Sequence, residues 1–331
     1  VTALLLTILQ LARIGESADF RCYTPRDAIP GCTCTDGWDY LWRLNGRAVD
    51  DLIITDYPNA RLPGDVFPNT VSIKRIVIAD SPELIGFGPK LKPDKTFFAN
   101  LGHSLESIVV HNCPNVDDRE WVNIGETLAK GNAVPVLKHL TIGSDNNYLI
   151  ADPKAFAKLA NIETLTLRAN ALTTFAEDLT AFKALRFLDL TANRQLKTFN
   201  PPALPNTLTN ILLAETAITR LAHETIAMLK HVDFVDLRKN PLSCYCEDIQ
   251  EICDREDLQR KFVGALCATP IGKNNTIFGT SCEWEFPPST KPPTTVATES
   301  SDTNGTTVDP DDDTASQTFA KFLYRLVSHW Q

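Results

Sequence analysis

The stretch Ile162-Glu-Thr-Leu165-Thr-Leu167-Arg-Ala-Asn170-Ala-Leu172 decides the fold of this chain. It follows the pattern L-x-x-L-x-L-x-x-N-x-L, with apolar residues at positions 1, 4, 6 and 11 and asparagine at position 9. Close copies begin at residues 185 and 232, and a looser copy begins at residue 208. The starts at 162, 185, 208 and 232 are therefore separated by 23, 23 and 24 residues. A nearly constant period of this length is typical of a protein whose units stack on one another.

Weaker copies begin at residues 49, 73, 105 and 137, so the pattern predicts about eight units over residues 49–239. The period and the pattern are those of a leucine-rich repeat, whose unit is one short strand and a return segment. A unit this small cannot bury its own apolar face, so the units must stack. The prediction is an α/β fold: a curved, horseshoe-shaped solenoid with a parallel sheet on its concave side.

The position within the unit predicts the role of each residue. Residues at positions 1, 4 and 6 point into the core, and residues at positions 3, 5 and 7 point to the concave surface. A small polar side chain at position 9 can satisfy buried backbone groups of the next turn. Trp121, Ile124 and Leu128 recur at helical spacing and predict a helix in one return segment.

Nine cysteines agree with export to an oxidising compartment. Cys113 stands at position 9 of its unit and is expected to be a buried free thiol. The other eight lie at the two ends of the repeat array. They are Cys22, Cys32 and Cys34 at one end and Cys244, Cys246, Cys253, Cys267 and Cys282 at the other.

The run Asn240-Pro-Leu-Ser-Cys244-Tyr-Cys246, followed by Cys267 and Cys282, resembles the C-terminal cap of extracellular leucine-rich repeat proteins such as Slit and the Toll-type receptor ectodomains. The resemblance implies disulfide-bonded caps at both ends of the solenoid. In the C-terminal cap, over residues 240–286, it implies the pairs Cys244–Cys267 and Cys246–Cys282.

The N-terminal cysteines resemble the matching N-terminal cap, over residues 19–48, where the family-like pair is Cys22–Cys34. These pairs give Cys32 and Cys253 no disulfide partner. Eight strands at about 4.8 Å separate the caps by roughly 35–40 Å, whereas a disulfide needs Cα atoms within about 7 Å. Each leftover cysteine is therefore a free thiol or an intermolecular link, and a disulfide-linked homodimer stays open.

The two ends of the chain predict an extracellular location. Residues 1–18 are an apolar run typical of a signal peptide whose start is truncated. Asn274 and Asn304 each begin an N-glycosylation acceptor motif. Residues 287–316 are rich in Ser, Thr, Pro and Asp and predict a disordered stalk. Residues 317–331 predict an amphipathic helix for membrane association or docking.

The sequence predicts neither an enzyme nor a cofactor-binding or metal-binding protein. It carries none of the common catalytic or phosphate-binding motifs. His111 and His139 both face the concave surface, but their positions 7 and 3 are too far apart for one metal ion. A net charge of −9 without a basic cluster argues against nucleic-acid binding, because phosphate contacts need grouped Lys and Arg.

The concave positions of the last three units predict a binding site for an extracellular protein ligand. The candidate residues are Phe187, Asp189, Leu212, Phe234, Asp236 and Arg238. Exposed apolar residues beside charges are typical of binding hot spots. The alternative is that the aspartates are structural and that the two phenyl rings pack on their neighbours.

These observations predict a secreted or cell-surface protein-binding module without catalytic activity. Two alternatives stay open. The chain could be the truncated ectodomain of a membrane receptor, or a structural component of the extracellular matrix linked through Cys32 and Cys253.

Overall fold

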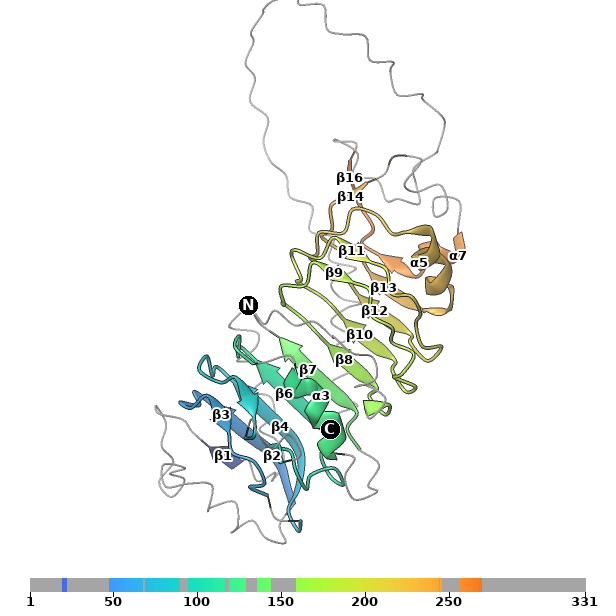
Figure 1. Ribbon diagram of the computed structural model, residues 1–331. Coiled ribbons are helices and arrows are strands. Elements are labelled where there is room, and N and C mark those ends of the chain that lie inside the picture. Colours follow the sequence, from blue (N-terminus) through green and yellow to red (C-terminus); the bar gives the residue numbers. More distant parts are fainter. Residues whose placement is uncertain are drawn as a thin grey trace, which may run out of the picture. The chain divides into compact units, whose positions relative to one another are not determined.

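The chain folds as a leucine-rich repeat solenoid whose strands follow one another along a single large sheet (Figure 1). This computed structural model describes residues 20–22, 48–67, 69–89, 95–116, 119–128, 136–143, 159–243, 245 and 256–269. All of them belong to one compact unit, residues 1–284. The sheet has ten strands in the order β1-β2-β4-β6-β7-β8-β10-β12-β13-β15. Every neighbouring pair in it is parallel.

Eight of these strands coincide with the eight predicted units. They are β2 (Ala48–Thr55), β4 (Ser72–Ala79), β6 (Ser107–His111), β7 (His139–Gly143), β8 (Thr164–Thr166), β10 (Phe187–Asp189), β12 (Asn210–Leu212) and β13 (Phe234–Asp236). Two further strands, β1 (Phe20–Cys22) and β15 (Phe262–Val263), pair with β2 and β13 at the ends of the sheet. The repeat pattern predicts no strand at either end, because neither segment carries it.

The return segments hold short strands and helices. Three parallel two-stranded sheets form from β3 (Arg61–Leu62) with β5 (Gly86–Phe87), β9 (Thr174–Phe175) with β11 (Thr198–Phe199), and β14 (Leu242–Ser243) with β16 (Cys267–Thr269). The described helices are α3 (Arg119–Leu128), α5 (His223–Met228), η4 (Leu229–His231) and α7 (Glu256–Gln259). The predicted helix around residue 121 is confirmed as α3, which buries Ile124 and Leu128.

The core lies where the repeat pattern places it. Leu185, Leu188 and Leu190, at positions 1, 4 and 6 of one unit, are fully buried, and the residues whose burial is described at these positions of the other units are buried too. The longer units at the N-terminal end need more volume, which aromatic rings fill. Phe97 contacts Phe67 and Phe98 edge to face, with ring centroids 5.0 and 5.5 Å apart. Each such contact adds about 0.5–1.5 kcal/mol to the burial of the rings.

The asparagine at position 9 ties its unit to the one before it. Asn193 Nδ2 donates to the carbonyl of Leu167 in the preceding unit (2.9 Å) and to that of Leu190 in its own unit (2.6 Å). Asn170 and Asn240 also donate to the preceding unit. The predicted role of position 9 is confirmed, but these bonds run to the preceding turn rather than the next one.

Cys113 takes the same position and is a free, buried thiol, as predicted. Its Sγ lies 3.4 Å from the carbonyl of His111 and 3.9 Å from that of Ile78 in the preceding unit. Burial raises the pKa of the thiol to about 11, so it is protonated at neutral pH. The weak S–H donor thus stands in for the asparagine amide.

Position 8 has a left-handed backbone in each of seven described units, although none of the residues is glycine. The residues are Asp56, Asp80, Asn112, Ala169, Ala192, Glu215 and Lys239, with φ between 48° and 63°. This conformation turns the chain sharply after each strand. The amide of position 8 then donates to the position 7 carbonyl of the following unit, as in Ala192 N to Ala214 O (2.9 Å).

Replacing Asn193 by alanine should lower the free energy of unfolding by about 2–4 kcal/mol, because two buried carbonyls lose their donor. Chemical denaturation would measure the change. Asn206→Ala, at an exposed position outside the ladder, should change the stability by less than about 0.5 kcal/mol. Equal effects of the two substitutions would contradict the structural role of position 9.

Ala192→Gly should leave the stability unchanged or raise it, since a non-glycine residue at φ 63° is strained by roughly 1–2 kcal/mol. Ala184 lies in the preceding connection without a positive φ. There, the change to glycine should cost about 0.5–1 kcal/mol from the greater freedom of the unfolded chain. Thermal denaturation of the two variants compares their stabilities directly. If Ala192→Gly lowers the stability as much as Ala184→Gly does, the backbone at residue 192 is not strained.

Candidate functional site

The residues at positions 3, 5 and 7 of the eight units form one face of the large sheet, here called the sheet face. The parallel register aligns equal positions of neighbouring strands in rows. Phe187 pairs with Asn210, and Asn210 pairs with Phe234. Asp189 pairs with Leu212, and Leu212 with Asp236. Phe187, Leu212 and Phe234 therefore do not form one apolar column, because they lie in two different rows.

Leu212 also differs from the prediction in its exposure. Only 7% of its surface is accessible, so it is a buried residue between two aspartates rather than an exposed contact. Phe187 and Phe234 are half-buried. The asparagine between them is half-buried too, and its Oδ1 accepts a hydrogen bond from the hydroxyl of Thr209 (2.7 Å). This bond fixes the amide so that Asn210 Nδ2 remains a donor between the two rings.

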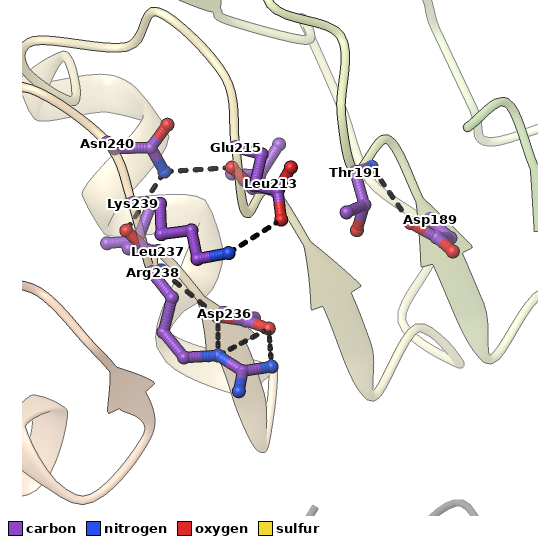
Figure 2. Close-up of polar contacts among 9 residues, drawn as sticks. All are labelled: Asp189, Thr191, Leu213, Glu215, Asp236, Leu237, Arg238, Lys239 and Asn240. Carbon is purple, nitrogen blue, oxygen red and sulfur yellow. Dashed lines mark hydrogen bonds and ion pairs between the residues drawn. The ribbon is translucent and has the colours of Figure 1, made fainter. Parts of the chain in front are cut away.

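Asp189 has a structural role in the turn that follows its strand (Figure 2). Its Oδ1 accepts a hydrogen bond from the backbone amide of Thr191 (2.8 Å). The residue is only 7% exposed. This burial raises the pKa of the Asp189 carboxyl, against the hydrogen bonds from Thr191, which lower it. The alternative that this aspartate is structural therefore has direct support from its contacts.

Asp236 and Arg238 form a two-pronged ion pair at the other end of the same row (Figure 2). Arg238 Nη2 lies 2.7 Å from Asp236 Oδ2, and Nε lies 3.0 Å from Oδ1, which also accepts from the Arg238 amide (3.1 Å). Asp236 is 1% exposed. Gly264 makes room for the arginine, because a Cβ there would lie 2.0 Å from Arg238 Cγ. The burial of Asp236 and the space left by Gly264 thus hold the ion pair in place at the end of the sheet.

The N-terminal half of the sheet face was not singled out from the sequence. Arg75 pairs with Asp51 on the adjacent strand through two bonds of 2.7 and 2.5 Å. Beside this pair, the half-exposed side chains of Ile53, Val77 and Val109 form one apolar row. Reading positions 3, 5 and 7 in the earlier units, as in the last three, identifies these residues.

The same positions hold an arginine that is not among the candidate residues predicted from the sequence. Arg168, at position 7 of the unit that contains β8, is exposed and makes no ion pair with any residue the structure describes. Its neighbour in the preceding unit is Gly143: a Cβ on that glycine would lie 3.1 Å from the Arg168 carbonyl oxygen.

The histidines lie as predicted. His111 pairs with Gly143 and His139 with Ser107, so the imidazoles are offset by four residues along the strands. Burial lowers the pKa of His139. Within the described ranges, no three side chains of the metal-binding types are grouped closely enough to hold a metal ion.

The predicted modification sites lie mostly outside the described residues. Cys22 is in β1, and Cys267, in β16, is disulfide-bonded. The remaining sites outside the described ranges are Cys34, Cys244, Cys246, Cys282, Asn274 and Asn304. The pairings therefore stay predictions, as do the signal peptide, the stalk and the C-terminal helix. Of the helices in the described part of the chain, none has the length and hydrophobicity to cross a membrane.

Comparison with known proteins supports the repeat assignment. Residues 135–194 match the family model of the leucine-rich repeat. No curated protein matches the sequence. A solved structure of human 5T4 (Wnt-activated inhibitory factor 1, trophoblast glycoprotein) is similar, with a TM-score of 0.52 and 18% sequence identity over 71% of this chain and 86% of that chain. At this identity the likeness shows the fold, which is typical of protein-interaction modules rather than enzymes.

The two aspartates of the sheet face should respond differently to replacement by asparagine. The pKa of Asp189 is raised above 3.8 in the folded state, so its contribution to stability is present at low pH and is lost as the pH rises through the folded-state pKa. At about pH 7 the buried carboxylate lowers the stability of the folded state. Asp189→Asn removes this charge and keeps an acceptor for the Thr191 amide, so it should leave the stability unchanged or raise it.

Asp236→Asn removes the charge that Arg238 pairs with, and should lower the free energy of unfolding by about 1–3 kcal/mol. Urea denaturation of both variants at about pH 5 and about pH 7 makes the comparison. If Asp189→Asn lowers the free energy of unfolding at the higher pH as much as Asp236→Asn does, the charge of Asp189 stabilises the fold.

Proposed function

We propose that this chain is a secreted or cell-surface protein that binds an extracellular protein ligand through its sheet face and carries out no catalysis. The observation that carries the proposal is the row Phe187, Asn210, Phe234. Two half-buried phenyl rings flank an amide donor on three rigid neighbouring strands. Aromatic side chains on a rigid support are the usual anchors of protein interfaces, because little conformational freedom is lost when they bind.

The charged groups of the sheet face favour binding over catalysis. A general acid or base must have a proton-transfer group available to a substrate. Asp236 and Asp51 are instead held in ion pairs with arginines of the same face, and Asp189 is held by a backbone amide. The carboxylates of the described sheet face are thus committed to the structure.

An extracellular location is supported by several independent features. The chain has nine cysteines, and Cys267 is disulfide-bonded. The apolar run at 1–18 and the acceptor motifs at Asn274 and Asn304 agree with export. Such a protein meets its partners outside the cell, where a disulfide persists.

Replacing both Phe187 and Phe234 by alanine should weaken binding to a protein partner by on the order of tenfold or more, which corresponds to about 1.4 kcal/mol. The partner can be found by screening the folded chain against an array of extracellular protein domains, and the affinity measured by surface plasmon resonance. The melting temperature should change little, because neither ring belongs to the hydrophobic core cluster.

Ile85→Ala is the matched control, since Ile85 is an exposed apolar residue outside the sheet face. It should bind the partner as the unmodified chain does. A large fall in melting temperature in the Phe187/Phe234 variant would identify the rings as core. Unchanged affinity in that variant would place the interface elsewhere.

A further inference from the structure

Three arginines and three aspartates occupy positions 3, 5 and 7 of the eight units. Two of the arginines, Arg75 and Arg238, are joined to aspartates of the same face. The third aspartate, Asp189, is buried and bonded to the Thr191 amide rather than to an arginine. Arg168 is therefore the sheet-face arginine that keeps its guanidinium unpaired among the described residues.

The surroundings of Arg168 leave its guanidinium accessible. Gly143, beside it in the preceding unit, has no side chain, and Thr191, at the same position of the following unit, is small and buried. On the far side of Gly143, the ring of His111 would lie 4.0 Å from a Cβ placed on the glycine. In this row the buried backbone of Gly143 thus separates the arginine from the imidazole.

Hydroxyl groups lie on the same part of the face. Thr166 is two residues before Arg168 on the same strand, roughly 6.6 Å away, and pairs in register with Thr141 on β7. Both side chains are half-buried, and the structure gives neither hydroxyl a hydrogen-bond partner among the described residues. The nine sheet-face positions of β6, β7 and the β8 unit hold no acidic residue. The sheet-face carboxylate that interacts electrostatically with Arg168 is Asp189 in the following unit, which is buried and forms no ion pair with it among the described residues.

From this charge complementarity we infer that Arg168, with the hydroxyls of Thr141 and Thr166 beside it, binds an aspartate or glutamate side chain of the protein partner. The inference rests on the proposed function and names the chemistry of the ligand. A guanidinium offers two parallel N–H donors that fit both oxygens of a carboxylate. A single unpaired arginine suits a single carboxylate, whereas a sulfated polysaccharide needs several grouped cations.

The test uses the full chain to select short random peptides from a display library. We expect the selected peptides to carry an acidic residue, and Arg168→Ala to weaken their binding by on the order of tenfold or more. Arg168→Lys should give an intermediate affinity, because it keeps the charge and loses the paired donors. Arg194→Ala, an exposed arginine off the sheet face, should bind as the unmodified chain does. Binding of the unmodified chain should also fall with added salt more steeply than that of Arg168→Ala.

Selected peptides without a carboxylate, or acidic peptides that bind Arg168→Ala equally well, would overturn the inference and leave the proposed function standing. The same holds if a heparin fragment binds through Arg168 and acidic peptides do not. Peptide binding that depends on Arg168 but not on Phe187 and Phe234 would support the inference and refute the role of the rings. If no peptide is enriched, the inference is also refuted.

Discussion

The whole fold depends on backbone groups that one unit leaves unpaired and its neighbour satisfies. In seven described units the chain turns through a left-handed residue at position 8, and in six of them its amide donates to the following unit. The side chain at position 9 then donates to the carbonyl of the preceding unit, as in Asn193 to Leu167. Because an unpaired buried backbone group costs about 1–3 kcal/mol, no unit is stable on its own. Stacking is therefore imposed by hydrogen bonding as much as by the apolar core.

This constraint explains why the interior tolerates imperfect repeats. Cys113 replaces the amide of asparagine with a weaker S–H donor at the same position. Ser81 instead accepts a bond from the amide of Tyr57 in the preceding unit. Each substitute keeps a polar atom at the same buried place. The strand spacing and register, and with them the positions of the sheet-face side chains, are preserved across the units.

The repeat predicted the strands and the buried positions well, since both follow from local periodicity. The repeat could not predict the exposed fraction of each sheet-face side chain, because this depends on how far the neighbouring residues cover it. Leu212 lies at a position that faces away from the core, yet the residues around it bury it. The pairing register, which places Phe187 and Phe234 two strands apart in one row, follows from equal position numbers. The end strands β1 and β15 carry no repeat signal, and tertiary pairing alone makes them strands.

The rigidity of the sheet gives its charges a fixed arrangement, and this decides which of them can act on a partner. A charge already paired within the face offers a partner little, because binding would have to break one ion pair to form another. Asp51 with Arg75, and Asp236 with Arg238, are of this kind. An unpaired charge needs no such exchange. Between the two ion pairs, the exposed Arg168 lies beside the hydroxyls of Thr141 and Thr166. This part of the face is therefore where a partner's charge can add affinity and not merely replace an existing contact.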